Sequence, residues 1–192
     1  MRKIILASKS KVRQKLLRQM GLKFCVAISR VKESRSLKPR CGDLVIDNAL
    51  KKAKDVAKKF DSGVVIGADT VVLTGRKKIV GKPKNKKDAF KILRTISQKP
   101  QWVYTGLAVI DIDNGKVFTT CEKTKIYMHR LSDAQIKKYF SKVSPLDKAG
   151  AFDIQGLGSI FINRIEGCFY NVVGLPIAKL ARILEKIDIE IF

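Results

Sequence analysis

Asp69 is the residue most out of place for packing alone. With Thr70 it interrupts residues 64–73, an otherwise apolar run rich in valine and isoleucine, which is typical of a central strand. A carboxylate inside such a strand has to be paired, metal-bound or catalytic, because an isolated buried charge is very unfavourable. The alternative is a bulge or strand end beside Gly67 that leaves Asp69 at the surface.

Lys52 lies on the apolar side of a long helix predicted over residues 44–60. Apolar residues recur on that side at helical spacing, and Lys52 falls among them. An inward lysine is costly to desolvate unless its ammonium meets an anion. Amphipathic stripes are imprecise, however, and Lys59 also comes close to this side. The pattern therefore leaves both an anion-binding and a purely structural lysine open.

The N-terminal segment combines a short strand, a serine-rich turn and a helix. Ser10 is the expected N-cap of a helix that ends before Gly21, and Ser8 lies in the turn. Free N–H groups and hydroxyls at a helix N-terminus form an anion site. Arg13 falls on the apolar side, from where it would reach back towards a bound phosphate. A capped helix with a snorkelling arginine is the alternative.

A glycine-containing loop is predicted over residues 144–158. Loops of this length in a compact domain often carry binding residues. Gln155 has donors and an acceptor that would read the edge of a base. A glycine-rich loop by itself is weak evidence, and the single histidine, His129, is interpreted as a structural or surface residue.

The remaining pattern mixes strands and helices without strict alternation, which predicts an α/β fold with a mixed twisted sheet flanked by helices. The Asp113-Asn114-Gly115 segment indicates a hairpin, and Ser132 with Gln135 predicts a capping box. Strands are expected at residues 3–6, 24–28, 64–73, 79–80, 103–112, 117–128 and 160–165. Helices are expected at residues 11–20, 44–60, 88–96, 132–140 and 177–187.

Composition indicates a globular chain. Of the 192 residues, 45% are hydrophobic and 30% are charged. The four scattered cysteines and one histidine do not favour a zinc site, and such cysteine usage fits a reducing compartment. No apolar run has the length of a signal peptide or a membrane span, so we expect a cytoplasmic protein.

The formal charge of +23 raises the question of nucleic-acid binding. The lysines are spread along the chain in pairs, however, without the interleaved aromatic residues that a single-strand groove needs. We therefore interpret most of this charge as solvated surface that favours anionic substrates. A nucleic-acid partner is not the expectation.

Taken together and in this order, these segments resemble the Maf family of nucleotide pyrophosphatases over nearly the whole chain. Single tripeptides mean little, but about seven in the correct order are specific. The matching residues are Leu6-Ala7-Ser8-Lys9-Ser10 with Arg13, Glu33, Lys52-Ala53, Gly67-Ala68-Asp69-Thr70-Val71, Gly81-Lys82-Pro83, Tyr104-Thr105-Gly106, Pro145-Leu146-Asp147-Lys148-Ala149-Gly150-Ala151, Ile154-Gln155-Gly156 and Asn171-Val172-Val173-Gly174-Leu175-Pro176.

The resemblance implies a nucleotide diphosphatase that splits a nucleoside triphosphate into monophosphate and pyrophosphate. It also implies one Maf-like domain over residues 1–192, with two lobes, a central cleft and an ITPase-like sheet, in a protein that is often a homodimer. Family members are linked to housekeeping of the nucleotide pool and, in some bacteria, to restraint of septum formation.

Roles for individual residues follow from the same resemblance. Asp69 corresponds to the proposed proton acceptor, and Glu33 is the natural second carboxylate for a magnesium or manganese ion. Whether Asp69 is the base, a metal ligand or both stays open. Phosphate oxygens would be held by Ser8, Ser10, Arg13, Lys52 and Lys82.

Substrate choice depends on a few positions within the family. Thr70 and Gln155 match the branch that acts on dTTP and UTP, whereas a second branch acts on 7-methyl-GTP. The usual Ser-Pro-Arg-Arg motif reads Ser10-Lys11-Val12-Arg13 here, so an arginine that contributes to selectivity is replaced by Val12. Val12 is expected to join the apolar stripe of its helix. We expect a pyrimidine preference with reduced or altered discrimination.

Two further hypotheses remain. One is a pyrophosphatase for 7-methyl-GTP or another modified nucleotide. The other is a basic nucleic-acid-binding or regulatory protein that keeps the fold without turnover. The presence of Glu33, Lys52, Asp69 and Lys82 favours an enzyme, because a degenerate binder would be expected to have lost at least one of them.

Overall fold

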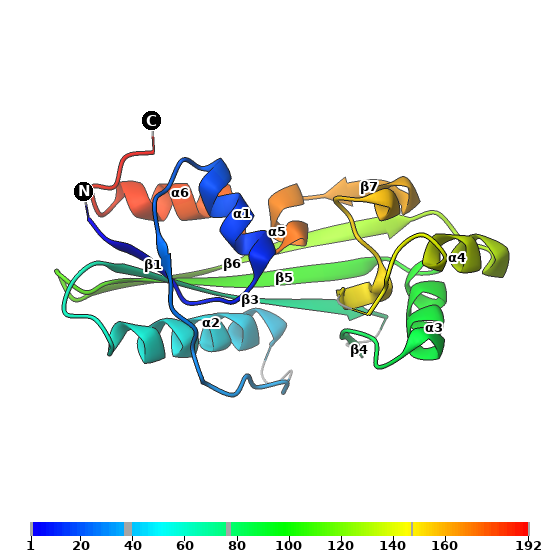
Figure 1. Cartoon of the computed structure of the whole chain (residues 1–192), viewed down its shortest axis with the longest axis horizontal. Helices are drawn as coiled ribbons and strands as arrows, with labels where there is room; N and C mark the ends of the chain where they lie inside the picture. The colour runs from blue at the N-terminus through cyan, green and yellow to red at the C-terminus, as the bar shows by residue number, and fades with distance from the viewer. Residues whose placement is uncertain (1, 37–39, 76–77, 147, 192) are drawn as a thin grey trace. The chain divides into compact units, whose positions relative to one another are not determined.

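The computed structural model describes residues 2–36, 40–75, 78–146 and 148–191, and in this part of the chain it shows a seven-stranded mixed sheet with helices (Figure 1). The strands are β1 (Ile4–Leu6), β2 (Cys25–Val26), β3 (Val64–Thr74), β4 (Lys78–Val80), β5 (Gln101–Asp111), β6 (Lys116–Met128) and β7 (Ile162–Glu166). The helices are α1 (Lys11–Gln19), α2 (Cys41–Ala57), α3 (Lys86–Ile96), α4 (Asp133–Phe140), α5 (Phe169–Val173) and α6 (Ile177–Glu185), with 3-10 turns η1 (Ala149–Ala151) and η2 (Leu157–Phe161).

The strand order is β2-β1-β3-β5-β6-β7, and β4 pairs with β3 as an antiparallel hairpin. β1 is parallel to both β2 and β3, whereas β6 and β7 are antiparallel. The expected α/β fold with a mixed sheet is therefore confirmed. No helix among the described residues is long and apolar enough to cross a membrane.

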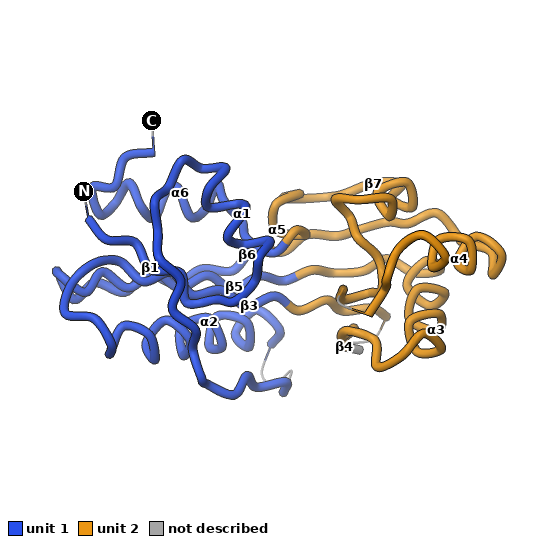
Figure 2. The backbone as a smooth tube through the Cα atoms, in the orientation of Figure 1, with its two compact units in different colours: residues 1–70, 104–122, 174–192 blue, residues 71–103, 123–173 orange. Residues whose placement is uncertain are grey.

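The chain divides into two compact units (Figure 2). Unit 1 comprises residues 1–70, 104–122 and 174–192, and unit 2 comprises residues 71–103 and 123–173. The boundary falls inside strands β3, β5 and β6.

In unit 1 the strands lie between α2 on one side and α1 with α6 on the other (Figure 1). The core between α2 and the sheet consists of small and branched residues, among them Ala49 and Ala53 of α2 and Val65 of β3, which are all fully buried. Small side chains at this contact allow the helix to approach the strands closely.

In unit 2 a second core forms around α3 and α4. Leu93 and Ile96 of α3 and Ile136 of α4 are almost fully buried, and η1 packs against α3. Tyr139 contributes its ring to this core, 4.8 Å from the Phe161 ring, and its hydroxyl accepts a hydrogen bond from the N–H of Asp153.

Most of the predicted elements are present. The Ser10 side chain caps α1, Gly21 follows with a φ of +74°, and Ser132 and Gln135 form the capping box of α4. The structure adds α5, which was not expected, and two 3-10 turns. Both 3-10 turns fall within residues predicted as loop or strand. Asp147, in the same predicted loop, lies outside the described residues.

The expectation for Val12 was wrong, because its side chain is 40% exposed instead of joining the apolar stripe of α1. Burial on this helix starts one turn later, at Leu16 and Leu17. In the first turn the inward direction is taken by Arg13, whose guanidinium is held by four hydrogen bonds.

Candidate functional site

Asp69 lies within β3 and is only 5% exposed. Its Oδ1 is 2.7 Å from Nζ of Lys52, and its Oδ2 accepts a hydrogen bond of 2.9 Å from Nδ2 of Asn48. The alternative of a surface position is therefore excluded. The charge of this carboxylate is buried but paired, which is the arrangement that lets an ionised group persist inside a protein.

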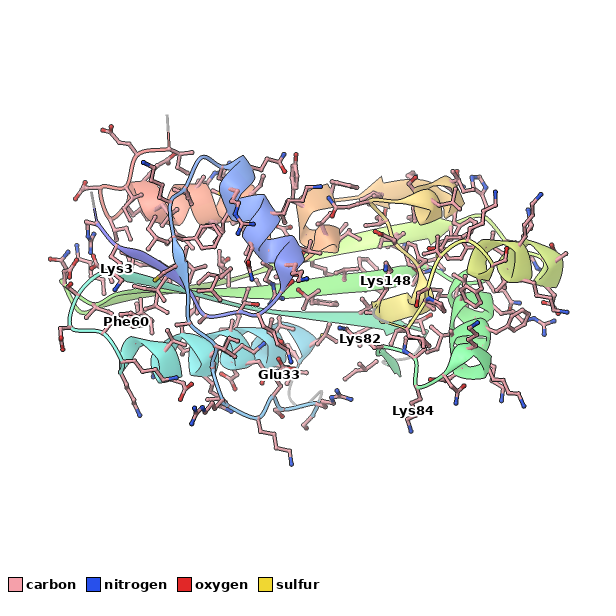
Figure 3. The ribbon with its side chains drawn as sticks, viewed as in Figure 1. Lys3, Glu33, Phe60, Lys82, Lys84 and Lys148 are labelled. Carbon is pink, nitrogen blue, oxygen red and sulfur yellow. The ribbon has the colours of Figure 1, made fainter. Side chains whose placement is uncertain are left out.

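Lys52 connects Asp69 to a second carboxylate. Its ammonium lies 2.6 Å from Oε1 of Glu33 and also donates to the carbonyl oxygen of Ala68 at 3.2 Å. The side chain is 10% exposed, whereas that of Glu33 is 49% exposed. A buried lysine on α2 thus joins a buried aspartate on the sheet to a half-exposed glutamate on the segment before α2, and Figure 3 labels Glu33 there.

The pKa of Glu33 is lowered from its ordinary value. Partial burial alone would raise it, but the hydrogen bond and charge of Lys52, with the charges of Arg13 and Arg35, outweigh that effect. Glu33 therefore stays an anion at neutral pH. Two carboxylates converge on one ammonium.

Two glycines explain how α2 reaches this position. A Cβ on Gly67 of β3 would lie 2.3 Å from the carbonyl oxygen of Ala49, and one on Gly106 of β5 would lie 2.1 Å from that of Val45. Backbone atoms cannot rotate away, so only glycine permits this approach. The helix backbone lies directly against the sheet, and side chains from its next turn reach Asp69.

Asn48 is the member of this cluster that sequence reasoning missed. It is 2% exposed, and besides Asp69 it bonds the backbone of Ser34, donating to its carbonyl oxygen at 3.0 Å and accepting from its N–H at 2.9 Å. These bonds connect Ser34, the residue next to Glu33, through Asn48 to Asp69. The available signal was the spacing of Asn48 and Lys52, four residues apart on the apolar side of one helix.

Arg13 joins the start of α1 to β3 and to the segment before α6. Four of its N–H groups donate to unit 1: Nη1 to Ser8 Oγ at 3.2 Å and to the Ala68 carbonyl at 2.9 Å, Nη2 to Thr70 Oγ1 at 2.9 Å, and Nε to the Gly174 carbonyl at 2.9 Å. Burial lowers the pKa of this guanidinium, while the charges of Asp69 and Glu33 raise it. These contacts make Arg13 a positioning residue, and its contact with phosphate stays a prediction.

Thr70 lies directly after Asp69 and is held on two sides. Its hydroxyl shares a 2.9 Å hydrogen bond with Thr105 and approaches the carbonyl oxygen of Gly174 at 3.4 Å. Gly174 has a φ of +120°, a conformation that side-chain-bearing residues rarely adopt. Segments that are far apart in the sequence thus form one hydrogen-bonded neighbourhood beside Asp69.

Ser8 and Ser10 act in the turn before α1. Ser10 Oγ accepts from the N–H of Arg13 at 3.4 Å, and Ser8 Oγ accepts from the N–H of Ser10 at 3.3 Å as well as from Arg13. The hydroxyls therefore serve the helix cap and the arginine. Val12, beside them, is exposed.

Lys82 and Gln155 belong to unit 2. Lys82 is exposed on the segment between β4 and α3, and Gln155 is exposed on the segment between η1 and η2. The N–H of Gly150 approaches the carbonyl oxygen of Gly81 at 3.4 Å, so the backbones beside Lys82 and Lys148 lie together in this unit (Figure 3). Lys148 was quoted in the sequence motif but not identified as a site residue.

The donors around Asp69 fit a magnesium or manganese ion and no softer metal. Glu33 and Asp69 supply carboxylate oxygens, and magnesium typically binds through one or two carboxylates together with water and substrate phosphates. Among the described residues there is no cluster of three or more histidine, cysteine, aspartate or glutamate side chains that would form an all-protein metal cage. The arrangement therefore suits an ion that substrate helps to hold.

Comparison with known proteins places these features in a family. The model of the Maf-like protein family matches residues 3–187. A dTTP/UTP pyrophosphatase of Methanosarcina barkeri is 44% identical, covering 100% of this chain and 98% of the relative. A protein of the same description from Desulforamulus reducens is 45% identical over 100% of both chains.

A solved structure, that of the Staphylococcus aureus Ham1 protein, superposes with a TM-score of 0.55 at 14% identity, covering 97% of this chain and 100% of that one. At this identity the likeness concerns the fold alone, and it agrees with the mixed sheet seen here. The family match and the full-length relatives show that the chain belongs to the Maf-like protein family.

Proposed function

We propose that this protein is a nucleoside triphosphate pyrophosphatase that acts on dTTP and UTP and releases the monophosphate and pyrophosphate. The proposal is supported by full-length relatives described as dTTP/UTP pyrophosphatases. The observation that carries it is the buried Asp69 carboxylate, held by Lys52 and Asn48 and linked through Lys52 to Glu33.

The chemistry requires a water to be deprotonated as it attacks a phosphorus atom. Asp69 is the proposed base. Each of its oxygens already accepts one hydrogen bond, and a carboxylate has about four lone-pair sites, so capacity for a proton of water remains. Lys52 and Asn48 fix the orientation of the carboxylate before substrate arrives, which lowers the reorganisation needed during the reaction.

A divalent cation, magnesium or manganese, is part of the proposal. When bound, it would neutralise charge on the phosphates and on the leaving pyrophosphate. Glu33 and Asp69 would hold it. Lys52 contacts both carboxylates, so it would hold them in place for the cation, and it is also assigned to phosphate oxygens.

Further phosphate contacts are assigned to Lys82 and to the Ser8 and Ser10 turn with Arg13. The exposure of Lys82 suits a side chain that meets an anion from solution. Lys148, whose backbone neighbours the same segment, is a second candidate of this kind. For Ser8, Ser10 and Arg13, the network of contacts supports a positioning role more directly than a phosphate contact.

Base selectivity is assigned to Thr70 and Gln155, with Val12 at a third position. The exposure of Val12 supports this assignment, because the side chain is accessible instead of packed in the core. Loss of an arginine there is expected to reduce discrimination without removing the pyrimidine preference. Action on 7-methyl-GTP is the alternative, and it differs in substrate only.

A cytoplasmic location and a homodimer complete the proposal. The four cysteines are free thiols, as a reducing compartment maintains. Burial raises the pKa of both Cys41 and Cys121 to about 11, so at neutral pH they are protonated and poorly reactive. A dimer would be detected by the mass of the protein in solution.

The test is pyrophosphate release from dTTP, UTP, 7-methyl-GTP and the other common triphosphates, with magnesium or manganese. Asp69→Asn should lower kcat by about a hundredfold to ten-thousandfold, the range expected for loss of a general base. Asp61→Asn is the matched control, because Asp61 is exposed and outside the cluster. Wild type and Asp61→Asn should release pyrophosphate selectively from dTTP and UTP, and Asp69→Asn should not. This result would support both the pyrophosphatase activity and the preference for dTTP and UTP.

Three results would each contradict a part of the proposal. Equal turnover by wild type and Asp69→Asn would remove Asp69 from the chemistry. No release from any triphosphate would favour a binding protein without turnover. Comparable rates for dTTP, UTP and 7-methyl-GTP would overturn the pyrimidine preference alone.

A further inference from the structure

A surface of unit 2 combines aromatic rings with basic side chains across three neighbouring strands. We refer to it as the aromatic–basic face. It comprises Trp102 of β5, Lys123, Lys125 and Tyr127 of β6, and Arg164 of β7. The β6 residues alternate with buried Thr124 and Ile126, so they share one side of the strand.

Each ring on this face contacts two cations. The Lys123 ammonium lies 4.0 Å and the Lys125 ammonium 5.1 Å from the centre of the Trp102 ring. Lys125 also lies 4.6 Å from the centre of the Tyr127 ring, and the Arg164 guanidinium lies 4.4 Å from it. Tyr127 and Arg164 are directly paired across β6 and β7. The rings and the charges therefore form one continuous array.

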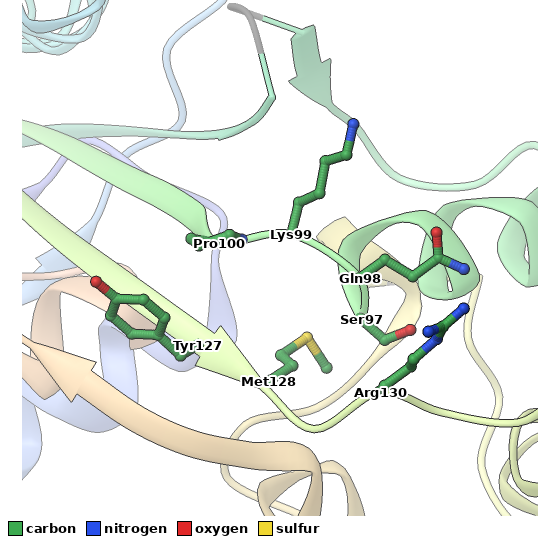
Figure 4. Close-up of a pocket in the computed structure, with 7 residues that line it drawn as sticks. All are labelled: Ser97, Gln98, Lys99, Pro100, Tyr127, Met128 and Arg130. Atoms are coloured by element: carbon green, nitrogen blue, oxygen red, sulfur yellow. The ribbon is translucent and has the colours of Figure 1, made fainter.

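A pocket extends this array beyond Tyr127 (Figure 4). Its volume is about 410 Å³, and its lining includes Lys99, Tyr127 and Arg130, which Figure 4 labels. Gln98 and Ser97 add polar groups to the same wall. Two more cations and an amide thus lie next to the aromatic–basic face, in a hollow large enough for a ring-sized group.

The charge of this surface is strongly positive. Five basic side chains belong to the face and the pocket, and Glu166 pairs with one of them, Arg164. Its carboxylate is 2.8 Å from Arg164 and accepts a hydrogen bond from the Tyr127 hydroxyl at 3.1 Å. Glu166 therefore orients these two groups.

Aromatic faces interleaved with cations are what a single-stranded nucleic acid requires, because bases stack on the rings while phosphates meet the basic groups. The energies favour such an exchange. Stacking of a base on a ring is stronger than the contact of a single cation with an exposed ring. A base can thus replace a lysine over a ring, and the released ammonium can bind phosphate.

The sequence hid this arrangement because its parts are far apart along the chain. Trp102 lies about twenty residues from Lys123 and about sixty from Arg164. The pairing of β5, β6 and β7 brings them together. The absence of clustered aromatics in the sequence is therefore no argument against a nucleic-acid surface in the fold.

We propose that the aromatic–basic face and the adjoining pocket bind single-stranded nucleic acid through stacking on Trp102 and Tyr127. This function is separate from triphosphate hydrolysis, since it uses none of the residues assigned to that reaction. An enzyme that hydrolyses free nucleotides would thereby be held near polynucleotides. The proposal stands or falls independently of the proposed activity.

The test uses the full-length protein and a fluorescently labelled oligothymidylate of about ten nucleotides, within the range that one such surface covers. Trp102 is the only tryptophan in the chain, so its fluorescence reports stacking directly. We expect the oligonucleotide to quench this fluorescence and to bind more tightly than a duplex of equal length. Trp102→Leu and Tyr127→Leu should each weaken binding by about tenfold to a hundredfold.

Matched charge variants separate this surface from general electrostatics. Lys123→Gln with Lys125→Gln should weaken binding, whereas Lys87→Gln with Lys91→Gln, exposed lysines of α3, should leave it nearly unchanged. Equal losses for both pairs, duplex binding as tight as single-strand binding, or unquenched Trp102 would overturn the proposal. A fourth result would also overturn it: wild type does not bind the oligonucleotide, and Trp102→Leu changes the oligomeric state. The face would then be a contact between copies of the chain. A circular dichroism spectrum and a thermal midpoint of Trp102→Leu that match those of wild type show that the variant folds.

Discussion

Asp69 and Lys82 illustrate how differently the two units hold their candidate site residues. Asp69 in unit 1 is 5% exposed, and both of its carboxylate oxygens are hydrogen bonded to side chains of α2. Lys82 in unit 2 is exposed and lies on a segment between elements, as does Gln155. Asp69 is fixed by regular structure, whereas Lys82 and Gln155 are presented to solvent.

The difference follows from what each set is expected to do. A base must be held in one orientation before the reaction, and buried hydrogen bonds from a helix achieve this. Groups that first meet a charged substrate need access and freedom to adjust, which loops provide. We therefore expect changes in unit 1 to alter stability and turnover together, and changes at the unit 2 lysines to alter substrate affinity alone.

The strongest challenge to this comparison is Gly106→Ala. A Cβ there would lie 2.1 Å from the carbonyl oxygen of Val45, so α2 would have to move away from the sheet. We expect a loss of about 3 kcal/mol of unfolding free energy, at the upper end for overpacking, together with lower turnover. Chemical denaturation and pyrophosphate release would measure both.

The matched control is Gly81→Ala in unit 2, where a Cβ would meet no atom within 4 Å and the backbone does not require glycine. Its stability should change by less than about 0.5 kcal/mol. If both variants are equally stable, α2 does not depend on the close approach, and the account of how Asn48 and Lys52 reach Asp69 is wrong.

Asn48→Ala tests whether the fixed orientation depends on the residue that sequence reasoning missed. The change removes the donor to Asp69 and both hydrogen bonds to Ser34. Because one of these bonds goes to a charged group inside the protein, we expect a loss of about 2 kcal/mol, seen as a lower denaturation midpoint. Turnover should fall as well, since Asp69 loses a restraint. The exposed Asn163→Ala is the control, and equal stability of the two variants would contradict the assignment.

Much of the fold and part of this site were readable from the sequence. The apolar run around Asp69, the amphipathic helix with Lys52 and the Ser10 cap predicted local structure, because their causes are local. The two partners of Lys52 are not close to it in the sequence. Glu33 and Asp69 lie on separate segments, and only the fold shows that one ammonium contacts both carboxylates. The resemblance to a family supplied that grouping.

Other features escaped because they depend on tertiary contacts. Val12 fits an apolar stripe by spacing, yet the core on that side of α1 begins a turn later. Asparagine is mostly a surface residue, so its residue type does not mark Asn48 as buried. Its role depends on hydrogen bonds to the backbone of Ser34, on the segment before α2. The carbonyl and hydroxyl acceptors of Arg13 come from segments up to 161 residues away, so the sequence could not show them, and its contact with phosphate stays a prediction.

Lys82→Gln tests whether an exposed lysine of unit 2 affects substrate affinity alone. Because the lysine is exposed and has no structural role in the core, its loss should leave stability within about 0.5 kcal/mol of wild type. We expect KM for dTTP to rise about tenfold with kcat nearly unchanged, as for a contact made equally in ground and transition states. Lys84→Gln, two residues away on the same exposed segment, should change neither value (Figure 3). A fall in kcat without a change in KM would instead place Lys82 in the chemical step.

The smallest expected effect concerns the pH dependence of Glu33. Its pKa in the folded protein is lowered by Lys52, Arg13 and Arg35 against the effect of burial, so its charge contributes stability above the pKa of the unfolded chain, about 4.3. That contribution is lost as pH falls through the lowered folded pKa. Because Glu33 is half-exposed, the contribution is at most about 1 kcal/mol. Denaturation of wild type and Glu33→Gln between about pH 3 and pH 7 should show a difference in unfolding free energy at the upper end that disappears at the lower end.

The control Glu185→Gln removes an exposed carboxylate of α6 and should follow wild type throughout. A constant difference between wild type and Glu33→Gln across the range would mean that Glu33 acts through packing, and the charge link from Glu33 through Lys52 to Asp69 would have to be abandoned.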